Sequence, residues 1–171
     1  LTFDELETFL HEFGHALHGM LGEGEYESQT GTNVYRDFVE LPSQLMENWA
    51  TEKEFLDLWA VHYETGEPIP AEIVDRIVAA QNYLAAYGNV RQLSFGMTDM
   101  AWHTLTEPFE GDVERFEAVS MAPTQVLPVV SGTAMAPAFG HIFSGGYAAG
   151  YYGYKWAEVL EADAFWLFKE K

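Results

Sequence analysis

Residues 1–20 read LTFDELETFLHEFGHALHGM, and their spacing predicts an amphipathic helix. Thr2 with Glu5 three residues later is a capping-box pattern, which is typical of a helix N-terminus. Leucine and phenylalanine then recur three and four residues apart, as on one face of a helix. The same helix carries the pentapeptide HEFGH at residues 11–15, whose two histidines and glutamate are unusual on an ordinary amphipathic surface.

The composition indicates a globular chain of one domain. Its 171 residues are enough to bury a core, and 48% of them are hydrophobic and 15% aromatic. The formal charge of −19 argues against a nucleic-acid partner, because the phosphates would be repelled. There are no cysteines, so any metal ion must be held by histidine and carboxylate ligands.

The two ends of the chain indicate a segment of a larger protein. The sequence starts at Leu1 instead of a methionine, and it ends within the aromatic-rich stretch ADAFWLFKEK. No apolar run is long enough to span a bilayer, and no signal peptide is recognisable. We therefore expect no membrane partner and a cytoplasmic location, with the periplasm left open.

Periodicity and helix-breaking residues predict a mainly α fold. Further helices are expected between Glu40 and Gly66, where Pro42 favours a helix start, and at about residues 71–87, 90–105, 112–121 and 147–171. The stretch 131–150, rich in Gly, Ser and Ala, is expected to form a loop. Residues 26–32 predict a short strand or extended segment, which either receives a substrate backbone by strand addition or is a plain connector.

The spacing within HEFGH is that of a zinc-binding helix. His11 and His15 lie one turn apart on one face, so both imidazoles can reach a single ion. Glu12 lies about 100° around the axis, where it can act as general base on a water molecule without being a ligand. The alternatives are a helix with partly exposed histidines and a di-iron carboxylate site, but the second Glu-x-x-His copy of a di-iron site is absent.

A third ligand must come from another element. His18 shares the face of the two histidines, but it lies about 10 Å along the axis from His11, too far for bonds of about 2 Å to one ion. Glu40 is the best candidate, because two histidines and a glutamate leave one position for water, as in catalytic sites. The groups that orient these ligands stay open among four residues near Glu40, namely Asp37, Ser43, Gln44 and Glu47.

The chain resembles the thimet oligopeptidase family of zinc metallopeptidases, most strongly its bacterial oligopeptidase A and peptidyl-dipeptidase branches. Four segments carry the resemblance: HEFGHALHGM, GTNVYRDFVELPSQLMENWA, HYETGEPIP and GHIFSGGYAAGYYGYKWAEVL. The resemblance implies part of a zincin-like helical catalytic domain, with one zinc ion (Zn2+) held by His11, His15 and Glu40. It also implies short peptide substrates and, as a partner, the remainder of the catalytic domain.

Peptide hydrolysis also needs hydrogen-bond donors for the oxyanion of the transition state. Tyr147, Tyr151 and Tyr154 are spaced to share one face of the expected last helix, close in sequence to His141. This spacing also fits an aromatic stripe in a core, whereas the adjacent glycine-rich loop and His141 favour a site. The resemblance implies transition-state roles for His141 and Tyr154, substrate contacts for Tyr147 and Tyr151, and a loop that closes over substrate.

The sequence thus predicts a zinc-dependent peptidase that hydrolyses short peptides by metal-activated water, with Glu12 as general base. A strict peptidyl-dipeptidase, which removes dipeptides from the C-terminus, stays open as an alternative. So does a non-catalytic fragment that binds zinc and is inactive alone. The choice between endopeptidase and peptidyl-dipeptidase depends on the groups that bind the substrate C-terminus.

Overall fold

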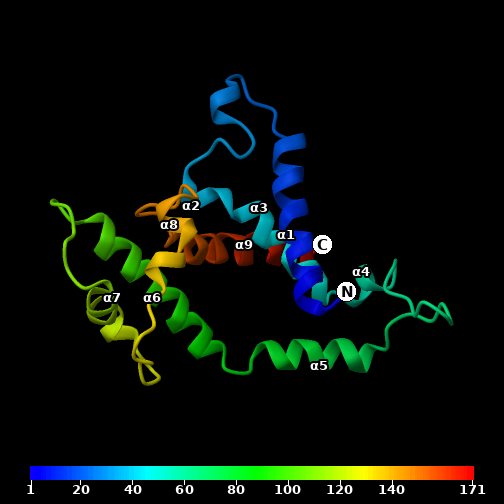
Figure 1. Ribbon diagram of the computed structural model, residues 1–171. Coiled ribbons are helices and arrows are strands. Elements are labelled where there is room, and N and C mark those ends of the chain that lie inside the picture. The colour runs from blue at the N-terminus through cyan, green and yellow to red at the C-terminus, as the bar shows by residue number, and fades with distance from the viewer. The chain divides into compact units, whose positions relative to one another are not determined.

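The computed structural model describes all residues 1–171 and is mainly α, as the sequence predicts (Figure 1). The β structure consists of one isolated antiparallel bridge between Val61 and Pro68. The chain forms two compact units: the first holds Leu1–Tyr83 with Trp156–Lys171, and the second holds Leu84–Lys155. None of the helices combines the length and the apolar character needed to cross a membrane.

The first unit is built on the predicted N-terminal helix. The capping box is confirmed: the Thr2 hydroxyl accepts the backbone N–H of Glu5, and the Glu5 carboxylate accepts the backbone N–H of Thr2. The helical elements that begin in this unit are α1 (Phe3–Met20), η1 (Glu27–Gln29), α2 (Arg36–Val39), α3 (Leu41–Glu47), η2 (Asn48–Thr51), α4 (Lys53–Leu56) and α5 (Ala71–Gln81). The helical region expected between Glu40 and Gly66 is therefore a series of short helices.

Helix α3 packs directly on α1 at Gly14, the fourth residue of HEFGH (Figure 1). A Cβ atom at Gly14 would lie 2.4 Å from the carbonyl oxygen of Pro42 and 2.5 Å from Cα of Ser43. Real Cβ atoms do not approach backbone this closely, so the contact requires glycine. The backbone of α3 thereby sits against the turn of α1 that carries the two histidines.

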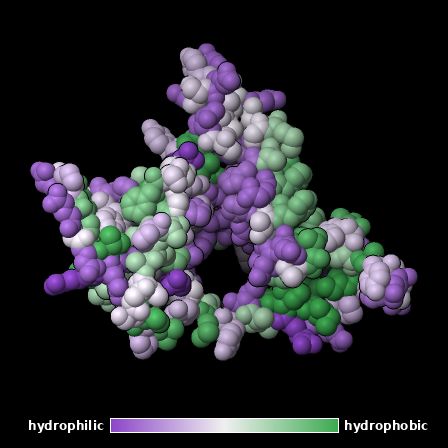
Figure 2. Space-filling view, viewed as in Figure 1, coloured by the Kyte–Doolittle hydropathy of each residue, from purple (hydrophilic) through white to green (hydrophobic).

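One face of α1 is buried and another is exposed. Leu6 and Leu10 join a core cluster with Ala50, Leu56 and Val74 from η2, α4 and α5. On the exposed side the rings of Phe9 and Phe13 are stacked, with centroids 6.3 Å apart. Figure 2 shows hydrophobic residues along the exposed side of α1.

The second unit is formed by two longer helices and the segment that follows them. Its helical elements are α6 (Ala85–His103), α7 (Val113–Met121), η3 (Ala122–Thr124), η4 (Ala136–Ala138) and α8 (Gly140–Phe143), and it ends in the first turn of α9 (Gly153–Lys169). The helix expected at 71–87 is interrupted because Leu84 adopts a left-handed conformation with φ +57°. The stretch expected to be a loop contains η4 and α8.

The strand expected near the candidate metal site does not form. Tyr26 and Thr30 have extended backbone, but residues 27–29 between them make one turn of 3-10 helix. Gly31 then turns the chain with φ +57°. Because the segment has no continuous extended run and no paired neighbour, the interpretation as an edge strand for substrate is wrong.

Candidate active site

The three predicted metal ligands come together in the first unit. His11 and His15 stand one turn apart on α1, and Glu40 lies at the junction of α2 and α3. The Nε2 atoms of His11 and His15 lie 3.3 Å and 3.2 Å from Oε2 of Glu40. All three residues offer a ligand atom within 4.8 Å of the others.

This donor set fits a zinc ion. Bonds of about 2.0–2.2 Å in tetrahedral geometry separate neighbouring ligand atoms by about 3.4 Å, close to the distances from Glu40 to each histidine. Glu40 is only 2% exposed, and a buried carboxylate needs a compensating charge. The Ser43 hydroxyl donates to Oε2 of Glu40 over 2.8 Å, which directs this carboxylate.

Glu47 orients His11 from the other side of its ring. Oε1 of Glu47 lies 2.6 Å from Nδ1 of His11, so the ring presents Nε2 to the donor set. Hydrogen bonds to Glu40 and Glu47 raise the pKa of His11 to about 10. Only the neutral imidazole binds zinc, so ion and proton compete for this nitrogen. Of the four candidates that the sequence offered, the structure places Glu47 against His11 and Ser43 against Glu40.

Glu12 and His18 lie on α1 beside the metal ligands, and neither belongs to the ligand group. Glu12 lies next to His11 along α1, is exposed, and makes no hydrogen bond or ion pair in the chain, so its carboxylate is accessible. His18 lies outside the group of potential ligands, in agreement with its distance along the helix. It packs against the ring of Phe38, and burial lowers its pKa. His18 is therefore a packing residue of the neighbouring turn.

The predicted histidine and tyrosines form an aromatic cluster in the second unit. The ring of Tyr154 lies 5.1 Å from that of Tyr147 and 5.0 Å from that of Tyr151. The ring of His141 is 6.2–6.3 Å from all three. We call these four residues, His141, Tyr147, Tyr151 and Tyr154, the tyrosine cluster.

The three tyrosines do not share a helix, so the prediction that they lie on one face of the last helix is wrong. Helix α9 begins at Gly153, so Tyr147 and Tyr151 precede it. Gly146 and Ala149 have positive φ angles of +84° and +53°, which no helix tolerates. Turns therefore bring the rings together.

A buried carboxylate holds these turns. Asp99 of α6 is fully buried, and its two oxygens accept the backbone N–H groups of Ala149 and Tyr151 at 2.9 Å each. The Tyr151 hydroxyl donates to Gln92, also on α6, over 3.1 Å, and burial raises the pKa of Tyr151. Sequence reasoning missed Asp99. Asp99 is the one acidic residue of α6, and this is the signal that could have found it.

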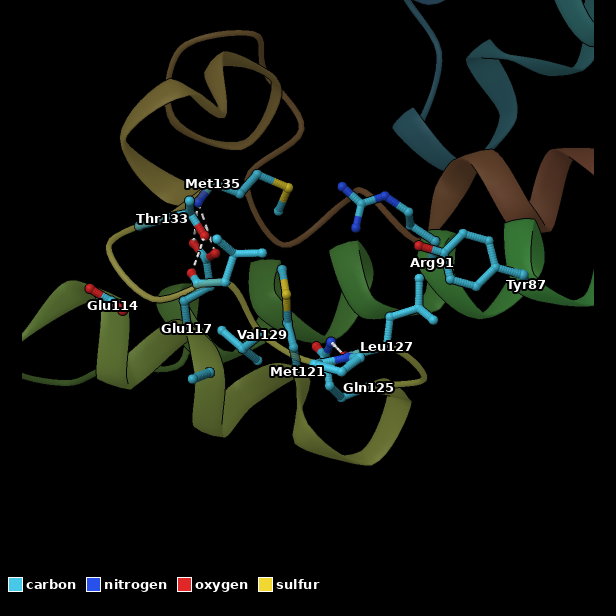
Figure 3. A pocket seen from close by; sticks show the side chains of 14 residues that line it. Tyr87, Arg91, Glu114, Glu117, Met121, Gln125, Leu127, Val129, Thr133 and Met135 are labelled. Atoms are coloured by element: carbon cyan, nitrogen blue, oxygen red, sulfur yellow. Dashed lines mark hydrogen bonds between the residues drawn. The ribbon is translucent and has the colours of Figure 1, made fainter.

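A separate cavity of about 400 Å³ lies between α6, α7 and residues 125–135 (Figure 3). None of the predicted site residues lines it. At one end the Glu117 carboxylate accepts the backbone N–H groups of Met135 and Ala136, as the dashed lines to Met135 show. This part of the second unit is thus organised by a second buried acid.

Comparison with known proteins identifies the family of the chain. The sequence model of peptidase family M3 matches residues 1–171, which is the whole chain. The chain belongs to peptidase family M3. Oligopeptidase A of Salmonella typhimurium is 49% identical over 99% of this chain, and oligopeptidase A of Escherichia coli is 48% identical over the same share. Dipeptidyl carboxypeptidase of Escherichia coli is 39% identical over all of it.

These M3 relatives confirm the resemblance to oligopeptidase A and to the peptidyl-dipeptidases. They are also much longer, because the chain spans only 25% of the length of each of them. The activity of the whole protein is therefore a matter for proposal, on the strength of the residues that this segment contains.

Proposed function

We propose that the chain is the metal-binding part of a zinc-dependent peptidase that hydrolyses short peptides. The observation that carries the proposal is the group of His11, His15 and Glu40, whose ligand atoms lie within 4.8 Å of one another. Membership of peptidase family M3 supplies the reaction class, the hydrolysis of a peptide bond. A bound zinc ion would polarise the substrate carbonyl and lower the pKa of a water molecule.

Glu12 is the general base of this proposal. It follows His11 on α1 and is exposed, so its carboxylate can accept the proton of the attacking water. The same carboxyl group then returns that proton to the leaving amine, which leaves Glu12 ionised for the next cycle. Glu47 keeps His11 in the orientation that this arrangement requires.

The tyrosine cluster supplies hydrogen-bond donors. His141 and Tyr154 are assigned to the oxyanion, because the phenol of tyrosine is protonated at neutral pH and can donate to a developing negative charge. Tyr147 is assigned to substrate, and its ring stacks on that of Tyr154. Tyr151 is assigned a supporting contact, since its hydroxyl donates to Gln92.

We assign an endo-acting oligopeptidase as the first candidate and a peptidyl-dipeptidase as the second. The higher identity to the oligopeptidase A relatives, 49% and 48% against 39% for dipeptidyl carboxypeptidase, favours the first. The two activities are separated by blocking the C-terminal carboxylate of a peptide substrate. An endopeptidase cleaves the amidated peptide, whereas a peptidyl-dipeptidase requires the free carboxylate.

The decisive experiment is Glu12→Gln in the full-length protein, assayed on a quenched short peptide alongside its zinc content. Because the amide cannot accept the proton, we expect kcat to fall by about 10²- to 10⁴-fold while zinc stays bound. Glu23→Gln, an exposed glutamate beyond the same helix, is the matched control and should retain full activity. Full activity of Glu12→Gln with zinc bound would refute the catalytic proposal and favour a segment that only binds metal.

A further inference from the structure

The carboxylate of Asp99 is in an unusual position for a charged group. It is fully buried on α6, where it accepts two backbone N–H groups and lies beside the ring of His103. Oδ1 accepts the backbone N–H of Ala149 and Oδ2 that of Tyr151, while Nδ1 of His103 lies 2.7 Å from Oδ1. A buried charge is retained at a cost in desolvation, so a residue satisfied in this way calls for an explanation beyond packing.

The segment that Asp99 binds is the turn between two tyrosines of the cluster. Residues 149 and 151 lie between Tyr147 and Tyr154, whose rings stack at 5.1 Å. Ala149 has φ +53°, a conformation that residues other than glycine rarely adopt and that needs support from its surroundings. The two hydrogen bonds to Asp99 give that support, since each oxygen fixes one N–H of the turn.

No neutral side chain of the same size can replace this carboxylate. Asparagine has a single acceptor oxygen, and its amide nitrogen would face the second N–H donor of the turn. A carboxylate accepts both, and His103 at the following turn of α6 keeps it aimed at the segment. The carboxylate thus fixes two backbone N–H groups between Tyr147 and Tyr154.

We propose that Asp99 is a positioning residue for catalysis, which acts through Tyr154 by holding the 149–151 turn. This inference rests on the proposed function and adds a residue to it. Asp99 touches no reacting group of that function. Its effect on rate is therefore expected to depend on the Tyr154 hydroxyl.

The second unit contains a matched control in Glu117. Glu117 is also a buried carboxylate, 8% exposed, and it also accepts two backbone N–H groups, those of Met135 and Ala136. It anchors the chain at the start of η4, which precedes α8 and the tyrosines in sequence, and Figure 3 shows its hydrogen bonds to Met135. Loss of either carboxylate removes a similar set of hydrogen bonds, so a merely structural role predicts the same outcome for both.

The test measures kcat, Tm, zinc content and amide hydrogen exchange in the full-length protein. The variants are Asp99→Asn, Glu117→Gln, Tyr154→Phe and the double variant Asp99→Asn with Tyr154→Phe. We expect Asp99→Asn to lower kcat by about tenfold to a hundredfold, as displaced catalytic groups do, with zinc retained. Glu117→Gln should lower Tm to a similar extent and leave kcat within about twofold of the original.

The double variant separates positioning from a general loss of structure. If Asp99 acts through Tyr154, Asp99→Asn should cost little further rate once the Tyr154 hydroxyl is absent. The inference would be overturned if Asp99→Asn lowered kcat by the same factor with and without the Tyr154 hydroxyl. An equal loss of kcat in Glu117→Gln would also overturn it. If Asp99→Asn does not fold, His103→Gln goes through the same measurements, since it removes the contact of Nδ1 with the carboxylate and keeps both acceptor oxygens of Asp99.

Hydrogen exchange gives a readout that is independent of activity. Asp99→Asn should accelerate exchange in the peptide that covers residues 147–154, and Glu117→Gln should not. Unchanged exchange in Asp99→Asn would show that the carboxylate does not hold the turn. By contrast, a wild-type protein without zinc-dependent activity would refute the proposed function itself, and a Tyr154→Phe variant at full rate would remove the residue through which Asp99 is proposed to act.

Discussion

In the first unit, the two histidines of the metal group come from one helical turn, whereas in the second unit the tyrosine cluster is assembled by the turns between α8 and α9. His11 and His15 are adjacent because a helix repeats every 3.6 residues. Tyr147 and Tyr151 are adjacent to Tyr154 because a buried aspartate fixes the backbone between them. The histidine pair is therefore set by local geometry, whereas the turns of the tyrosine cluster are held by a contact between distant parts of the sequence.

This difference predicts different responses to mutation. Removing a ligand should abolish metal binding and leave the helix in place, because the helix is stabilised by its own capping box and core. Removing a support of the tyrosine cluster should leave the metal in place and reduce the rate. The predictions below separate the two groups on this basis.

The largest effect is expected from the loss of Glu40. Glu40→Ala leaves two ligands, so zinc content and zinc-dependent peptidase activity should both be lost, as they should be after removal of the metal by a chelator. Zinc analysis of the purified full-length protein measures this. His18→Ala is the control on α1, because His18 shares the face of the ligands but lies outside their group. Equal zinc content in Glu40→Ala and wild type would mean that another residue is the third ligand.

A smaller effect is expected from the tyrosine cluster. Tyr154→Phe removes one donor to the oxyanion, so kcat should fall by about 10²- to 10³-fold, with KM and zinc content little changed. Steady-state kinetics on a short peptide provide the measurement. Tyr152→Phe, at a residue that is 50% exposed, serves as the control. A change confined to KM would assign Tyr154 to substrate binding alone.

The smallest effect is expected from the residue that orients a ligand. Glu47→Gln weakens the interaction with Nδ1 of His11, so zinc affinity should fall by about 10- to 100-fold, measured by competition with a chelator of known affinity. At saturating zinc the activity should largely return. Glu52→Gln is the control, since Glu52 pairs with Lys169 and not with a ligand. Unchanged zinc affinity would remove Glu47 from the metal site.

The parts of the fold that the sequence predicted are those governed by local rules. The capping box at Thr2 and the ligand pair on α1 follow from spacing alone. Glu40 was chosen for its chemistry, and the structure brings it to the histidines through the junction of α2 and α3. The mainly α character followed from periodicity in the same way.

The parts that the sequence missed depend on contacts between distant residues or on unusual backbone. The extended segment failed because Gly31 turns the chain and residues 27–29 form a helical turn. The last helix was predicted to begin too early because alanine normally favours a helix, and nothing in the sequence indicates the positive φ of Ala149. Asp99 was missed because its function appears only when the turn that it binds is known.

The contact at Gly14 has a consequence for the choice of metal ion. Because the backbones of α1 and α3 touch there, the distance between the histidines and the Glu40 segment cannot widen without separating two helices. Calcium needs six to eight oxygen ligands at about 2.3–2.6 Å, and magnesium demands a near-octahedral set of oxygens. A compact set of two nitrogens and one oxygen on such a frame would therefore favour zinc over both ions. A glycine that binds nothing would thus contribute to ion selectivity by holding the ligand-bearing segments together.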